Sequence, residues 1–300
     1  MKVAFVPLAV QKGTDPARHL GPFRLEGAWH MKSRSWFFGS YSALLAMPDG
    51  SLLAISDGAD YLRFMPPDRS GAILDSGHVL PGWPVDKSDR DSESAARDPA
   101  TGKIWLGLEG SNSIVSLARD LHVFRKAEPE AMARWDDNSG AEAMTRLADG
   151  RFLVLCEGFD GWFERRRHGA VVFEGDPTKK GAKSSHFVFD GPAGFSPTDM
   201  AQLPDGRLLI LMRRLVWPAP QRFAGRIAVA DPAEIRPGKV WKAHEVARIA
   251  SSLPIDNFEG LAVTPVDDHR INVWIISDDN YSNLQQTVLW KLSVDPRQLP

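Results

Sequence analysis

The repeating unit of this chain is clearest in residues 142–157, which read EAMTRLADGRFLVLCE. One apolar run begins at Glu142, a turn follows at Asp149-Gly150, and a second run ends at Glu157, equally far from the turn. Asp-Gly between two apolar runs is a strong signal for a two-residue β-hairpin. Residues equidistant from such a turn face each other, so the unit predicts two antiparallel strands with paired carboxylates at the open end.

The same pattern occurs five times along the chain. Its terminal pairs are Ser42 with Asp57, Glu93 with Glu109, Glu142 with Glu157, Asp199 with Arg213, and Glu259 with Asp278. The turns between them are Asp49-Gly50, Thr101-Gly102, Asp149-Gly150, Asp205-Gly206 and Asp268-His269, of which four are good hairpin turns. We therefore expect the members of each pair to be cross-strand neighbours.

The spacing of the units predicts the fold. Their first residues are 51, 49, 57 and 60 positions apart, and periods near ~50 with several short strands each are typical of a β-propeller. Four strands are expected in the second unit (Glu93–Arg97, Lys103–Glu109, Ser113–Leu117, His122–Arg125) and in the third (Glu142–Leu147, Arg151–Glu157, Ala170–Glu174, Ser185–Phe189). The fold class is all-β, a single β-propeller of four-stranded blades. Five blades are favoured, and six are open if Val3–His30 supplies more than one strand.

The last unit ends one strand short, with expected strands at Glu259–Thr264, Ile271–Ser277 and Thr287–Leu292. Phe23–His30 alternates well enough to supply the missing outer strand and close the ring. We therefore expect one domain over residues 1–300, with 1–31 as an N-terminal extension and closing strand and 32–300 as the blades. Single helical turns are expected only near 128–134 and 231–235.

Composition excludes several classes of function. Lys and Arg number 36 against 38 Asp and Glu, so no global basic field predicts binding of nucleic acid. No apolar run approaches ~18 residues, so no membrane span is expected. The single cysteine, Cys156, excludes an internal disulfide. The N-terminal apolar run Val3–Val10 is short and contains Pro7, which does not resemble a signal peptide.

The inner-strand acids are candidate metal ligands. Glu93, Glu142, Asp199 and Glu259 each follow a polar loop, at the point where that loop enters the innermost strand, which should direct them to the propeller axis. With Asn138 and Asn257 nearby, they offer the hard oxygen ligands that calcium prefers, with magnesium as the other choice. The alternative is that they are solvated rim charges or hydrogen-bond acceptors for loop amides.

A second ring is expected one strand further out, made of Asp57, Glu109, Glu157, Arg213 and Asp278. Arg213 breaks the acidic series opposite Asp199. An ion pair with Asp199 is the favoured role, and the other is to hold an anionic group of a substrate. No Gly-x-Ser-x-Gly elbow, phosphate-binding Walker loop or dinucleotide fingerprint occurs in the chain.

Several motifs together resemble a known family. They are Phe38-Gly39-Ser40-Tyr41-Ser42-Ala43-Leu44, Ser56-Asp57-Gly58, Asp91-Ser92-Glu93-Ser94-Ala95, Gly140-Ala141-Glu142-Ala143-Met144, Glu157-Gly158, Asn257-Phe258-Glu259-Gly260-Leu261 and Ser277-Asp278-Asp279-Asn280. Their order from Phe38 to Leu292 resembles the bacterial phytase-like family, labelled "esterase-like activity of phytase". The resemblance implies a secreted or periplasmic β-propeller, with calcium and phosphate-ester hydrolysis suggested by the label. A cytoplasmic location is the alternative, because no export signal is present.

These observations lead to three functional hypotheses. The first is a metal-dependent hydrolase of phosphate or carboxylic esters acting on a small anionic or ester substrate, with Glu142, Glu259 and Arg213 as catalytic residues. A gluconolactonase-type lactonase is the second, and it would use Asn138 and Asn257 as further ligands. The third is a non-catalytic propeller that binds a ligand or protein and holds calcium for structure. A monomer is expected in each case.

Overall fold

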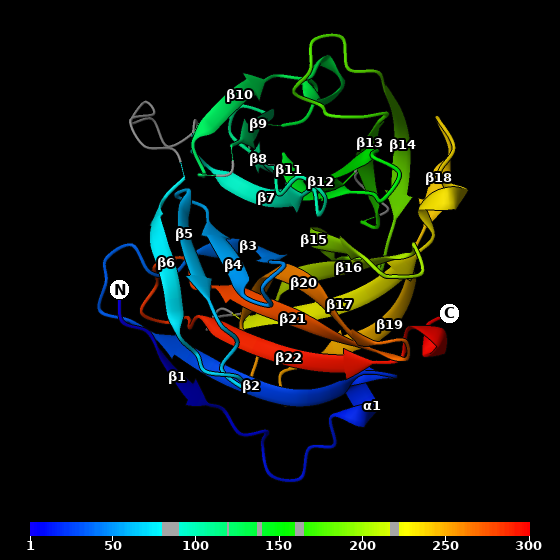
Figure 1. Cartoon of the computed structure of the whole chain (residues 1–300). Coiled ribbons are helices and arrows are strands. Elements are labelled where there is room, and N and C mark those ends of the chain that lie inside the picture. The colour runs from blue at the N-terminus through cyan, green and yellow to red at the C-terminus, as the bar shows by residue number, and fades with distance from the viewer. Residues whose placement is uncertain (80–89, 119, 137–139, 160–164, 217–221) are drawn as a thin grey trace.

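The computed structural model describes the chain except residues 80–89, 119, 137–139, 160–164 and 217–221. Its strands form five sheets arranged in a ring, which confirms the five-bladed β-propeller (Figure 1). The described helices are α1 (Ala17–Leu20) and the 3-10 turns η2 (Glu130–Met132), η3 (Pro232–Glu234) and η4 (Pro296–Gln298). Of these, η2 and η3 lie where single turns were expected. No described helix is long and apolar enough to span a membrane.

Each blade has four antiparallel strands, which are numbered below from the axis outward. Blade 1 is β3 (Tyr41–Ala46), β4 (Leu52–Ser56), β5 (Asp60–Phe64) and β6 (Ile73–His78). Blade 2 is β7 (Ser92–Arg97), β8 (Ile104–Leu108), β9 (Ser113–Leu117) and β10 (Val123–Ala127). Blade 3 is β11 (Ala141–Arg146), β12 (Phe152–Phe159), β13 (Arg167–Phe173) and β14 (Ser184–Asp190), with β18 (Val240–Lys242) added in parallel.

Blade 4 is β15 (Ser196–Gln202), β16 (Leu208–Val216), β17 (Arg222–Ala230) and β19 (His244–Ile249). Blade 5 is β20 (Asn257–Asp267), β21 (Arg270–Asp278), β22 (Val288–Val294) and β2 (Arg24–Lys32), with β1 (Ala4–Pro7) outside it. The four strands expected for each of the second and third units are all present.

Apolar packing between neighbouring blades forms the core. The second strands β4 and β8 are buried along their whole length, so both faces of each sheet are covered. Near the axis the blades approach so closely that only small residues fit. A Cβ on Gly107 would lie 2.8 Å from the Ala141 side chain, and one on Gly260 would lie 2.9 Å from the Ala43 backbone.

The register of the inner hairpins corrects the sequence prediction. In blade 3, Ala141 pairs with Cys156 and Ala143 with Leu155, so Glu142 is an extra residue in a β-bulge and does not face Glu157. Equivalent shifts occur in every inner strand, at Ser42, Glu93, Glu142, Thr198 and Glu259. Direct pairing was therefore wrong, because counting from the turn does not include the residue that a bulge inserts. The members of each pair still lie at the ends of the two innermost strands.

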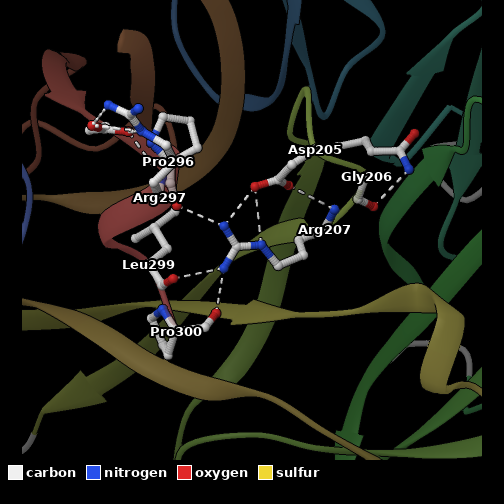
Figure 2. Close-up of polar contacts among 9 residues, drawn as sticks. Asp205, Gly206, Arg207, Pro296, Arg297, Leu299 and Pro300 are labelled. Carbon is white, nitrogen blue, oxygen red and sulfur yellow. Dashed lines mark hydrogen bonds and ion pairs between the residues drawn. The ribbon is translucent and has the colours of Figure 1, made fainter. Parts of the chain in front are cut away.

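Both ends of the described chain are held against the ring. On the N-terminal side, β2 pairs with β22, with Ala28 opposite Trp290, which confirms the closing strand. On the C-terminal side, Arg207 in the β15–β16 turn of blade 4 binds the segment that follows β22 (Figure 2). Its guanidinium donates to the carbonyls of Pro296 (2.7 Å) and Leu299 (2.9 Å) and is held by Asp205 (2.6 Å).

Deleting residues 1–31 should strongly destabilise the protein. The deletion removes the closing strand and the buried side chains Leu20, Phe23, Ala28 and Met31. Each large apolar side chain contributes about 1.5–3 kcal/mol, and 1 kcal/mol shifts the Tm of a domain this large by about 2–4 °C, so we expect a fall of at least about 10 °C. Deleting only residues 1–9, which removes the edge strand β1, should cost much less. Equal melting of the full chain and the longer deletion would disprove closure by β2.

Candidate functional site

The bulges create a ring of side chains at one end of the axis. The inner strands contact one another in the order β3, β7, β11, β15 and β20 around the ring, and all begin at the same end. A bulge re-aims the side chain of the extra residue and is common beside active sites. The ring consists of Ser42, Glu93, Glu142, Thr198 and Glu259, and the ends of the second strands place Asp57, Glu109, Glu157, Arg213 and Asp278 around it.

Two carboxylate trios share one residue. Glu109, Glu142 and Glu157 each offer an oxygen, and these three atoms lie within 4.8 Å of one another. Asp91, Glu93 and Glu109 form a second set with the same property. The carboxyl groups of Glu109 and Glu142 also share a hydrogen bond, which requires a proton on one of them. Full ionisation of both trios would bring like charges together, so protons or a cation must compensate.

Arg213 is the cation of this ring, but its partners differ from the expected one. Its Nε lies 3.0 Å from Glu259 Oε1, and its Nη2 lies 3.4 Å from Glu157 Oε1. Burial lowers the pKa of Arg213, but these two carboxylates outweigh burial and raise it above its usual value. The expected ion pair with Asp199 was wrong, because the bulge at Thr198 pairs Asp199 with Leu211 instead.

Asp199 instead fastens neighbouring inner strands together. The residue is 2% exposed, and its carboxylate accepts hydrogen bonds from the amides of Leu261 (2.6 Å) and Met200 (2.8 Å). The backbone of Leu44 is a third donor. Asp199 thus links blade 4 to blades 5 and 1, which fits the alternative of an acceptor for backbone amides. Among the described residues it belongs to neither carboxylate trio.

The buried acids favour their neutral forms. Burial, followed by repulsion from Glu259 and Glu157 respectively, raises the pKa values of Glu93 and Glu142 well above normal. Burial raises the pKa of Glu259 to about 8, although Arg213 opposes the shift. Burial also raises the pKa values of Glu109 and Asp278. At neutral pH the ring therefore holds protons that a bound cation would displace.

Asn257 supplies an unused oxygen beside these acids. Its side chain donates from Nδ2 to Glu259 (2.6 Å) and Asp278 (3.3 Å), and the residue is 2% exposed. Its Oδ1 is buried and has no hydrogen-bond partner in the part of the chain that the structure describes. A buried amide oxygen and several carboxylates are the hard donors that calcium or magnesium requires, so the residues present fit such an ion. Asn138, the other expected asparagine, lies outside the described residues.

Two features of the site were not predicted from the sequence, namely the role of Asp91 and the backbone strain in two of the motif loops. Asp91 belongs to a trio, and its position two residues before Glu93 could have identified it, because residues i and i+2 share a face of an extended chain. Left-handed backbone at Ser40 (φ 49°), Asn280 (φ 48°) and Tyr281 (φ 47°) marks two loops at the same end. Asp279 joins these loops by accepting from the amides of Ser40 and Tyr281. Such strain concentrates at functional sites.

Comparisons with known proteins agree with this picture. The family model described as "Phytase-like: Esterase-like activity of phytase" matches residues 37–281. No curated protein matches the sequence significantly.

Several solved structures are distantly similar to this chain. The PQQ-bound aldose sugar dehydrogenase from Streptomyces coelicolor is 12% identical (TM-score 0.49; 92% of this chain, 98% of that one). An α-L-arabinofuranosidase from Podospora anserina is 8% identical, with a TM-score of 0.49 over 86% of this chain and 93% of that one. The PQQ domain of a pyranose dehydrogenase from Coprinopsis cinerea is 10% identical, with a TM-score of 0.46 over 88% of this chain and 87% of that one. Similarity this distant assigns no chemistry.

Stability without a metal should fall as pH rises. The folded state holds protons on carboxyls whose pKa values exceed the usual ~4.3 of a glutamate, so the unfolded chain releases them first. Stability should be greatest near pH 5 and decline through about pH 8, the pKa of Glu259. Saturating calcium should reduce this decline. Thermal melts across this pH range, with chelator and with calcium, measure both effects. Superimposable curves in the two conditions would contradict displacement of protons by a cation.

Replacing Arg213 should destabilise the protein, because the carboxyl groups of the ring then repel one another without a neighbouring positive charge. Arg213→Gln leaves Glu157 and Glu259 without their cation, and breaking a buried pair costs about 3–5 kcal/mol. Urea unfolding in chelator should show this loss, and calcium should restore more stability to the variant than to the parent. Arg214→Gln, at the exposed adjacent position, is the matched control. If both variants unfold alike, the arginine does not neutralise the ring.

Proposed function

Because the chain belongs to the phytase-like family, described as "esterase-like activity of phytase", we propose that it is a metal-dependent hydrolase of phosphate or carboxylic esters. The observation that carries the proposal is the pair of carboxylate trios that share Glu109 beside Arg213. Acids with raised pKa values in a partly buried space are typical of reacting centres, where fixed charges create strong local fields.

The trios are the proposed cation site. Asp91, Glu93 and Glu109 would hold one calcium or magnesium ion, and Glu109, Glu142 and Glu157 offer an alternative or second position. When bound, such an ion polarises an ester oxygen and lowers the pKa of a coordinated water. Asp199, which is committed to backbone amides, is left out of this ligand set.

The remaining residues bind the substrate and move protons. The ion pairs of Arg213 engage Nε and Nη2, which leaves Nη1 for an anionic substrate group. Glu259 has a pKa of about 8, so at neutral pH it can give a proton to a leaving oxygen. Asn257 fixes the position of that carboxyl through its 2.6 Å hydrogen bond. Glu142, also buried, is the second candidate for acid or base catalysis.

A lactonase of the gluconolactonase type is the second candidate. The observation in its favour is Asn257, whose unpaired Oδ1 matches the asparagine ligand that such a site would need. Both activities open an ester bond, so the same assay distinguishes them. The family resemblance further favours an exported protein, and sites that bind calcium outside the cell commonly need only ~10⁻⁴–10⁻³ M affinity.

The double substitution Glu142→Gln with Glu259→Gln should abolish hydrolysis and weaken the response to calcium while preserving the fold, because it removes one carboxylate of the trios and the proposed acid, whereas the amides keep the shape. General acid–base catalysis contributes about 10²–10⁴-fold, so at least a hundredfold loss is expected. Turnover of phosphate esters, carboxyl esters and lactones, before and after chelation, is the measurement. Glu174→Gln with Glu234→Gln, at exposed positions, is the control. A parent protein inactive on the whole panel, yet stabilised by calcium, would indicate a binding propeller.

A further inference from the structure

A cavity lies on the outer side of the propeller, between blades 2 and 3. Its volume is about 1200 Å³. Its lining comes from the outermost strand β10, the residues around η2, the segment 177–182 and the start of β14. Because β10 and β14 are outer strands of their blades, whereas the inner strands carry the carboxylate ring, this cavity is separate from the ring.

Polar contacts hold one wall of the cavity in place. Asp176, at the base of the segment, lies 2.7 Å from the Lys103 ammonium and accepts a 2.8 Å hydrogen bond from the Trp105 indole. Both partners belong to blade 2, so the segment from blade 3 is fastened across the gap between the blades. Thr178 adds a 2.7 Å hydrogen bond to the same carboxylate. The cavity is therefore preformed, which lowers the entropic cost of binding a ligand.

The lining of the cavity is strongly basic. Its five basic residues are Arg125, Lys126, Arg134, Lys179 and Lys180, and its two acidic residues are Glu128 and Glu130. The lining therefore has a formal excess of three positive charges, although the net charge of the whole chain is −2. The pair between Lys126 and Glu128 is loose, at 3.8 Å and with the acid 70% exposed. The ion pairs of the described residues include none for Arg134, Lys179 or Lys180. A concave surface of one sign concentrates the field and attracts counter-ions.

We propose that this basic cavity binds a small molecule carrying several phosphate groups. Arg125, Lys126 and Arg134 come from the blade 2 side, and Lys179 and Lys180 come from the fastened segment, so a ligand needs more than one anionic group to meet both walls. Arginine matches phosphate with a bidentate fork, and lysine binds it as a point charge. The site is independent of the proposed hydrolase centre.

Calorimetric titration with inorganic tripolyphosphate in chelator tests the proposal, because chelator removes any cation that could bind phosphate at the axis. Wild type and the Glu142→Gln, Glu259→Gln variant should bind alike, with affinity falling as salt is added. Lys179→Glu with Lys180→Glu should weaken binding about tenfold or more, since two attractive charges become repulsive. Lys2→Glu with Lys32→Glu makes the same charge change at exposed positions on the β1–β2 side.

The proposal is overturned if tripolyphosphate does not bind at low salt, or if both lysine pairs weaken it equally. Citrate at matched ionic strength separates phosphate recognition from general attraction of anions. Citrate should bind at least about tenfold more weakly, the difference worth ~1.4 kcal/mol. Equal affinity for citrate and tripolyphosphate would refute a phosphate site.

Discussion

Repulsion among buried carboxyl groups at the propeller axis is the constraint on which the site depends. Two trios, each with oxygens within 4.8 Å of one another, share Glu109, and the arginine of the ring, Arg213, is already paired with Glu157 and Glu259. Charges this close and partly removed from water are too costly to leave uncompensated. Protons provide the compensation in the absence of metal, and a divalent cation is the compensation that we propose for the functional state.

The rest of the fold holds this unfavourable cluster together. Apolar packing between blades stabilises the fold, β2 closes the ring, and the Arg207 contacts hold the C-terminal segment against blade 4. Near the axis, Asp199 accepts amides of neighbouring strands, and Gly107 and Gly260 allow the blades to approach. The resulting rigidity prevents the carboxyls from moving apart. The stable blades thus offset the cost of a preorganised centre, as is common at functional sites.

The sequence predicted the blades well, because hairpin turns and strand alternation are local properties. It also predicted closure by Phe23–His30, since an incomplete last blade needs a partner. It did not predict the bulges, which depend on how inner strands crowd at the axis. For that reason Asp199 was placed in the ring, and Arg213 was given the wrong partner. Asp91 was recognisable from its spacing to Glu93, whereas the basic outer cavity joins residues far apart in sequence and required the structure.

The central claim is that a cation takes the place of protons on the axial carboxyls. Calorimetric titration of the metal-free protein with calcium at pH 7, repeated in two buffers of different ionisation enthalpy, gives the number of protons released per ion bound. Because burial raises the pKa values of the trio members Glu93 and Glu142 well above normal, release of about one proton or more per calcium at pH 7, falling as the pH is raised, is the result expected. Calcium binding without proton release, or no binding, would contradict the claim.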